Sequence, residues 1–184
     1  PGTVIRNNVF HDIRSHGYGG WGIYTDEGST GILIENNVVY RTKTGGFHQH
    51  YGKENVIRNN IFAFASEGQL QRTRDTEDHL SFTFERNIVY WAEGPLLHSN
   101  WTNRQYRFDR NLYFNVAGHP IDCAGRTFKA WQAAGQDRHS RVADPMFVAP
   151  HEGDYRLKKG SPALKLGFKP IDTSGVGIRP KNER

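Results

Sequence analysis

The chain has 184 residues, of which 36% are hydrophobic and 23% charged, a composition typical of one globular domain. No run of about 18 consecutive apolar residues occurs, so we expect neither a membrane-spanning helix nor a membrane partner. The formal net charge is +5, but Lys and Arg are interspersed with Asp and Glu, which argues against a nucleic-acid partner.

Five segments share one pattern, in which an apolar and a polar residue precede an asparagine-containing pair and a second apolar run. The second residue of each pair is Asn8, Asn37, Asn60, Asn87 or Asn111, at intervals of 29, 23, 27 and 24 residues. These intervals are typical of a solenoid in which one repeat forms one coil. The apolar runs are short and rich in β-branched and aromatic residues, which favours strands over helices.

The repeated asparagines are predicted to be structural. Asparagine suits a sharp bend between two strands because it tolerates a left-handed backbone and bonds to its own main chain. Asparagine side chains that stack from coil to coil can also form a ladder of amide hydrogen bonds.

A second strand is predicted in each coil. Ten residues after the last four of these asparagines stand Phe47, Leu70, Leu97 and Ile121. The matching residue of the first coil is Ile23, fifteen after Asn8, which implies a five-residue insertion near 15–19. Further residues are inserted around 75–78, and insertions in solenoids often lie on the binding face. We therefore expect an all-β, right-handed parallel β-helix of about five coils over residues 1–125.

Residues 126–184 are predicted to cap this stack. A short helix is expected at 127–134 with Thr127 as its N-cap, followed by strands at 146–148 and 155–157. Such a cap would cover the apolar end of the solenoid. Because the chain opens inside a repeat, we expect upstream coils or another domain of the same polypeptide to precede it.

The outward face of the second strands carries the candidate site. Side chains alternate along a strand, so the residues next to each inward apolar anchor point to solvent. The candidate catalytic residues on this face are Asp26, Glu27, His48 and His50. The candidate substrate-binding residues are Tyr24, Tyr51, Gln71, Arg74, His98, Asn100 and Trp101.

The acid and histidine residues of this face suggest proton transfer. A carboxylate one coil away from an imidazole, such as Asp26 beside His50, would orient the ring and raise its pKa. Asp26 and Glu27 would face opposite ways on a regular strand, so they can act together only if the strand ends between them, and Gly28 makes that ending plausible. Glycosidases hold two carboxyl groups about 5 to 9.5 Å apart.

An arginine, a cysteine and a tryptophan outside the candidate site have structural interpretations. Arg72 is predicted to point inward, where either the strand bends before it or an acid such as Asp75 or Glu67 pairs with it. The single cysteine, Cys123, is expected to be a small core residue. Trp21 is as consistent with core packing as with sugar stacking. No cofactor is expected, and a metal site is a minority interpretation.

Two stretches carry a resemblance to a known group: 20–28 (GWGIYTDEG) with 45–52 (GGFHQHYG), and 143–148 (ADPMFV) with 160–164 (GSPAL). With the repeats, they resemble right-handed parallel β-helix proteins of carbohydrate metabolism, which include polygalacturonases, polysaccharide lyases and β-helix glycosidases. The resemblance implies a polysaccharide or oligosaccharide partner and an extracellular or periplasmic location. The paired aspartates of polygalacturonases are missing, so their inverting mechanism does not carry over.

Three functions remain open from the sequence. The first is a glycoside hydrolase that acts on plant or acidic polysaccharide. The second is a non-catalytic β-helix carbohydrate-binding module, for example one that binds xylan. The third is a polysaccharide lyase in which His or Tyr removes a proton beside a uronate carboxylate held by Arg.

Overall fold

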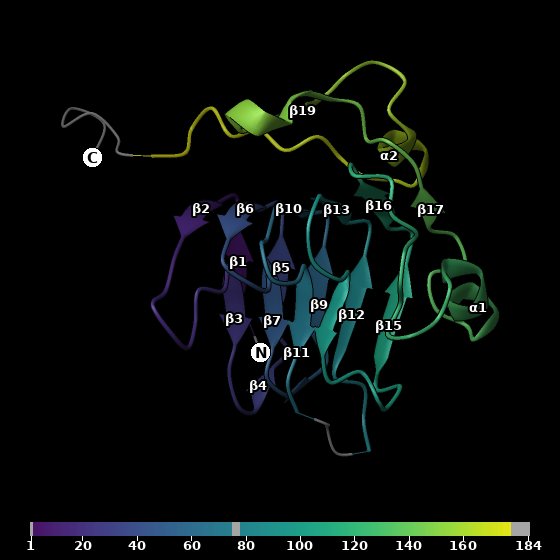
Figure 1. Ribbon diagram of the computed structural model, residues 1–184. Coiled ribbons are helices and arrows are strands. Elements are labelled where there is room, and N and C mark those ends of the chain that lie inside the picture. Colours follow the sequence, from purple (N-terminus) through teal and green to yellow (C-terminus); the bar gives the residue numbers. More distant parts are fainter. Residues whose placement is uncertain (1, 75–77, 178–184) are drawn as a thin grey trace.

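The computed structural model describes residues 2–74 and 78–177 of the chain. Three parallel sheets wind around a common interior and form a β-solenoid of about four turns (Figure 1). The predicted fold class, an all-β parallel solenoid with little helix, is confirmed.

Each complete turn contributes one strand to each of the three sheets. The first sheet contains β1 (Val4–Arg6), β5 (Leu33–Glu35), β9 (Asn55–Arg58), β12 (Phe82–Glu85) and β15 (Tyr106–Asp109). The second contains β2 (Val9–Ile13), β6 (Val38–Thr42), β10 (Ile61–Ala63), β13 (Ile88–Trp91), β16 (Leu112–Asn115) and β17 (Arg141–Val142). The third contains β3 (Ile23–Thr25), β7 (Phe47–Gln49), β11 (Leu70–Arg72) and β14 (Leu97–Ser99). The short strands β4 (Ser29–Thr30) and β8 (Gly52–Lys53) pair beside the third sheet.

The predicted register of the third sheet is confirmed over four coils. Ile23 pairs with Phe47, Phe47 with Leu70, and Leu70 with Leu97. Ile121 was expected to continue this row, but its segment forms no strand of the sheet. Pro120 precedes Ile121, and proline has no N–H to donate to a ladder. The fifth repeat is therefore incomplete, which is why the solenoid has about four turns rather than five.

The predicted asparagine ladder is present at the corner between the first and second sheets. The side-chain amide of Asn37 donates to Oδ1 of Asn60 at 2.9 Å, and that of Asn60 donates to Oδ1 of Asn87 at 3.0 Å. At the far end Asn111 donates to the buried carboxylate of Asp137 at 2.9 Å. The ladder residues do not make the left-handed bend themselves. The residue before each one does, with φ between 52° and 57° at positions 7, 36, 59, 86 and 110.

Aromatic side chains fill the interior, and a helix closes one end of it. Phe84 packs on Phe108 with ring centroids 5.0 Å apart. Helix α1 (Phe128–Ala133) lays Trp131 over Tyr106 at 5.7 Å, so the last coil is covered. Its predicted N-cap is confirmed, since the Thr127 side chain accepts a hydrogen bond from the main-chain N–H of Ala130.

We expected the rest of the C-terminal segment to cap the end of the stack as well. It instead runs back along the outer face of the second sheet (Figure 1). We call residues 146–177 the strap. Its elements are β18 (Phe147–Ala149), the 3₁₀ turn η1 (Pro150–Glu152), β19 (Asp154–Leu157) and α2 (Pro162–Lys165).

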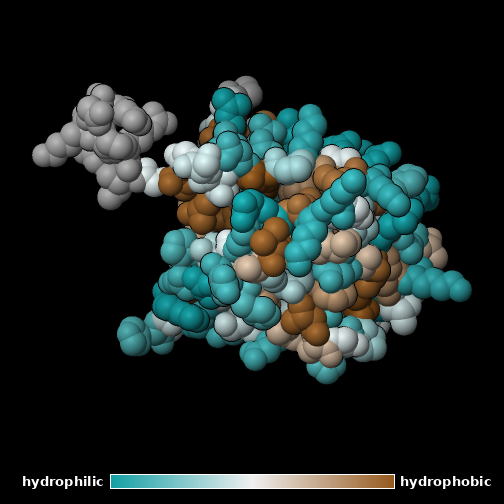
Figure 2. Space-filling view, turned by 90° about the horizontal axis from the view of Figure 1, so that it is seen from above, coloured by the Kyte–Doolittle hydropathy of each residue, from teal (hydrophilic) through white to brown (hydrophobic). Residues whose placement is uncertain are grey.

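A second apolar cluster joins the strap to the sheet. Phe147 and Tyr155 pack there against residues such as Ile88 and Tyr90. The strands of this sheet are apolar on both faces, because Val38 points outward while Val39 points into the solenoid, so both faces must be covered. Seen from the side of the strap, apolar residues show between hydrophilic ones (Figure 2).

The ladder predicts a position-dependent stability effect. Asn87→Ala removes four buried hydrogen bonds, to two neighbouring asparagines and the carbonyl of Ile57, and should lower the free energy of unfolding by about 3 kcal/mol. Asn8→Ala, at the half-exposed end, should cost about 1 kcal/mol. Urea unfolding followed by circular dichroism measures both. Equal losses at the two positions would contradict a cooperative buried ladder.

Candidate functional site

The acid residues lie just beyond the end of a strand of the third sheet. Strand β3 ends at Thr25, so Asp26 and Glu27 belong to a turn in which the carbonyl of Asp26 accepts from the N–H of Ser29 at 3.1 Å. One coil later β7 ends at Gln49, and the N–H of His50 donates to the carbonyl of Thr25 at 2.9 Å. The strand therefore ends before Asp26 rather than between Asp26 and Glu27 as expected, so both carboxylates lie in the turn and strand alternation does not hold them on opposite faces. The two turns lie side by side.

Both carboxylates approach one imidazole. Asp26 Oδ1 lies 3.6 Å from Nδ1 of His50, and Glu27 Oε1 lies 3.7 Å from Nε2 of the same ring. The predicted meeting of Asp26 and His50 across coils is confirmed. His50 is largely shielded, with 19% of its side chain exposed, while the Asp26 side chain is 69% exposed and open to a ligand.

Tyr24 links these groups and fixes the position of one proton. Its hydroxyl lies 2.6 Å from Asp26 Oδ1 and 3.0 Å from His50 Nδ1. The single phenolic proton is donated to the carboxylate, so the contact with the ring requires a hydrogen on Nδ1. Nε2 of a neutral His50 is then an acceptor that faces Glu27.

The surroundings keep Asp26 ionised and Tyr24 protonated. The hydrogen bond from Tyr24 is the main cause that lowers the pKa of the Asp26 carboxyl. Burial, followed by the hydrogen bond to Asp26, raises the pKa of the Tyr24 hydroxyl well above its ordinary value. Asp26 is thus an available base or nucleophile at neutral pH.

A third coil contributes a cation to the site. Arg74 Nη1 donates to Glu27 Oε1 at 3.1 Å, and its guanidinium lies 4.8 Å from the ring centre of Tyr51. The side chains of Arg74 and Glu27 are 57% and 55% exposed, so this pair forms one rim of the site.

Aromatic rings continue the site along the insertion of the first coil. Tyr18 meets Trp21 edge-on at 4.8 Å, and Trp21 stacks on Tyr24 at 4.6 Å. Trp21 belongs to neither core cluster, and its indole N–H donates to Oε1 of Gln71 at 3.0 Å. Tyr18 is 83% exposed. The candidate stacking surface is therefore Tyr18 and Trp21, and sequence reasoning had not selected Tyr18. The insertion at 15–19 was the signal that could have identified it.

His48 lies beneath the surface that it was predicted to help form. It is fully buried, packs against Trp21 and Tyr24 at 4.7 Å, and its Nε2 lies 2.9 Å from the Thr73 hydroxyl. Burial, with a smaller effect from His50, lowers its pKa from 6.5 to about 4. His48 is therefore uncharged at neutral pH and supports the ring of Tyr24 from below.

The other predicted substrate contacts divide into two groups. Gln71 and His98 continue the outward row in register after His48, and both are half-buried. Asn100 is also half-buried and its side-chain oxygen accepts from the N–H of Thr102 at 3.1 Å. Trp101 was predicted to be a surface contact, but it is 7% exposed and belongs to the interior cluster.

The inward position of Trp101 has a local cause. The backbone of Ser99 is left-handed, with φ of 70°, which interrupts the alternation of side chains after β14. Trp101 consequently packs against Phe82 and Tyr106, and its indole N–H donates to the carbonyl of His98 at 2.9 Å.

The inward orientation predicted for Arg72 is confirmed. It is fully buried and donates to the carbonyl of Asn100 at 3.2 Å and to Oδ1 of Asn103 at 2.5 Å. Of its two suggested acid partners, Glu67 instead approaches Lys43, and Asp75 lies outside the described residues. The prediction that Cys123 is a core residue is also confirmed.

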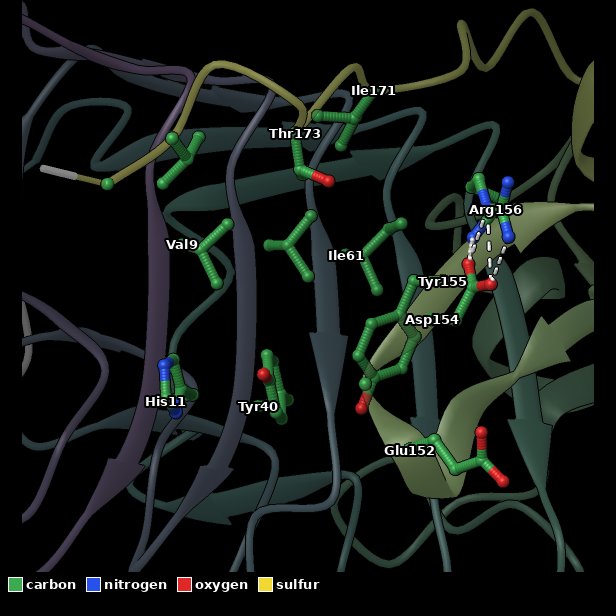
Figure 3. Close-up of a pocket in the computed structure, with 14 residues that line it drawn as sticks. Val9, His11, Tyr40, Ile61, Glu152, Asp154, Tyr155, Arg156, Ile171 and Thr173 are labelled. Carbon is green, nitrogen blue, oxygen red and sulfur yellow. Dashed lines mark hydrogen bonds and ion pairs between the residues drawn. The ribbon is translucent and has the colours of Figure 1, made fainter. Parts of the chain in front are cut away.

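A pocket lies between the strap and the outer face of the second sheet (Figure 3). This pocket has a volume of about 600 Å³ and an apolar floor that includes Val9 and Ile61. At its rim Asp154 is neutralised by Arg156, whose Nε donates to Oδ1 at 2.9 Å. Its lining therefore combines an apolar floor with polar side chains such as His11 and Glu152. The apolar floor of this pocket could have been predicted from the sequence, because strands of the second sheet are apolar at successive positions and so present apolar side chains on both faces.

Within residues 2–74 and 78–177, no three His, Cys, Asp or Glu side chains are arranged to hold a metal ion. The helices described in those ranges are too short and too polar to cross a membrane. Comparison with protein-family models, curated proteins and solved structures finds no match for this chain.

The buried, neutral His48 predicts how stability depends on pH. Its folded pKa of about 4 lies below the ordinary value of 6.5, so between these values the unfolded chain binds more protons. Stability should therefore fall as the pH drops from about 6.5 to about 4. The titratable groups that act on His48 electrostatically are His50, Asp26 and His98. Urea unfolding at pH 7 and pH 4.5 should show a smaller acid loss for His48→Gln than for the unchanged chain. The exposed His119→Gln variant should behave like the unchanged chain, and an identical acid loss in all three would contradict the assignment.

Proposed function

We propose that the chain is a glycoside hydrolase that acts on a polysaccharide or oligosaccharide. The observation that carries this proposal is the approach of Asp26 and Glu27 to opposite nitrogens of His50, at 3.6 and 3.7 Å. Two carboxyl groups on either side of one ring can adopt the separation of about 5 to 9.5 Å that glycosidases use. The resemblance of the repeats to carbohydrate-active β-helix proteins supports the same assignment.

The two acids have different roles in this proposal. Asp26 is held ionised by Tyr24, so it acts as the nucleophile or as the base that activates water. Glu27, which faces Nε2 of His50 at 3.7 Å, acts as the acid that protonates the leaving oxygen of the scissile bond. Arg74 orients Glu27 from the rim. His48 and Thr73 position the ring of Tyr24 from beneath.

Sugar rings would stack on exposed Tyr18 and half-buried Trp21. The apolar faces of pyranoses pack against aromatic rings, and Tyr18 and Trp21 present such rings beside the acids. The same observation favours a second candidate, a non-catalytic carbohydrate-binding module. A lyase is less well supported, because Tyr24 is protonated and Arg74 is already engaged by Glu27.

Activity on a polysaccharide panel tests the proposal. The chain is incubated with xylans, pectins and alginates, and we expect new reducing ends without the absorbance of unsaturated products. Asp26→Asn should lower the rate by a factor of about 10² to 10⁴, because it removes the ionised carboxylate. The matched control Asp122→Asn alters an exposed aspartate outside the cluster and should retain the rate. Full activity in Asp26→Asn would remove this residue from the mechanism.

Gel mobility in the same polysaccharides separates hydrolysis from binding alone. Retardation without product identifies a binding module, and unsaturated products identify a lyase. Trp21→Ala should weaken retardation about tenfold under either the hydrolase or the module, because it removes a stacking ring. Unchanged retardation would show that sugars bind elsewhere.

A further inference from the structure

A pocket at the closed end of the solenoid gathers positive charge. Its volume is about 430 Å³, and its walls come from three places: the corner after β15, the segment that follows α1 up to the first residue of β17, and the end of helix α2. In Figure 1, α1, β17 and α2 stand at the same end of the molecule. The lining residues with charged or titratable side chains are Arg110, Arg138, His139, Arg141 and Lys165.

Asp109, the carboxylate beside this pocket, does not neutralise the positive charge of its lining. Asp109 accepts from Arg110 at 3.2 Å and lies 2.9 Å from Nδ1 of His139. Arg138, Arg141 and Lys165 form no ion pair with any residue in the described part of the chain, and all three are exposed. Three like charges that repel one another therefore face one hollow without a counter-ion from the protein.

The backbone that carries these cations is held in place. The N–H of Asp137 donates to the carbonyl of Phe108 at 2.7 Å, and the N–H of Arg141 donates to that of Asn111 at 2.9 Å. Buried Asp137 anchors the same segment through the end of the asparagine ladder. The arginines thus project from a fixed frame, which reduces the ordering cost of binding a ligand.

We propose that this pocket binds an oxyanion group, a sulfate, phosphate or carboxylate, at a site separate from the acid cluster. Guanidinium groups recognise such anions through paired N–H donors, and Lys165 adds a point charge. Pockets of about 300 to 1,000 Å³ accommodate ligands larger than a single ion, so the volume has room for an anion carried on a larger molecule as well as for a free anion. The site shares no residue with the Asp26 cluster and does not depend on the proposed hydrolase activity.

Binding of dextran sulfate tests this site, with uncharged dextran as the reference polymer. The unchanged chain should bind dextran sulfate in low salt and not dextran. Arg138→Gln/Arg141→Gln should weaken binding about tenfold or more. The control Arg14→Gln/Lys53→Gln removes the same charge from two exposed positions outside the pocket and should change binding less than about threefold.

Competition with sodium sulfate distinguishes a free ion from a polymer-borne group. Displacement of dextran sulfate at low millimolar sulfate, matched against sodium chloride of equal ionic strength, assigns the site to the free anion. If sodium sulfate displaces dextran sulfate only at ionic strengths where sodium chloride displaces it equally well, the site is assigned to an anionic group on a polymer. Equal weakening in the two double variants, or no binding of dextran sulfate, would overturn the proposal.

Discussion

Register between coils is the constraint on which the rest of the molecule depends. The asparagine ladder contributes to it, because each buried side chain hydrogen-bonds the next asparagine and can be satisfied only when the coils stack in phase. The same register places the N–H of His50 against the carbonyl of Thr25. Asp26 and His50, which are 24 positions apart along the chain, thereby become neighbours, and the acid cluster follows from this register.

The coil register and the outward rows of side chains could be predicted from the sequence because two periodic patterns are present together. The repeat interval identified the coils, and the two-residue alternation of strands identified the outward rows. Ile23 could be aligned with Phe47 despite the insertion before it, which placed Asp26 beside His50. These predictions held because side chains within a regular parallel strand have little freedom to change face.

Failures occurred where the backbone left the regular strand or where burial depended on distant residues. The left-handed Ser99 turned Trp101 inward, a local conformation that the residue type does not specify. His48 faces outward in register, but Trp21 and Tyr24 cover it, so its burial follows from side-chain packing rather than from alternation. The path of the strap could not be predicted from the sequence, because an apolar segment can cover either the end or a side of a solenoid.

Disulfide formation between neighbouring coils tests the register most directly. Glu35 and Arg58 are direct partners on β5 and β9, where adjacent strands lie about 4.8 Å apart, within the range that a disulfide bridges. Glu35 and Val56 are two residues out of register, about 8 Å apart and beyond that range. Mass spectrometry of the oxidised protein should find a cross-link in Glu35→Cys/Arg58→Cys and none in Glu35→Cys/Val56→Cys. A cross-link in the second pair instead of the first would contradict the stacking that brings Asp26 to His50.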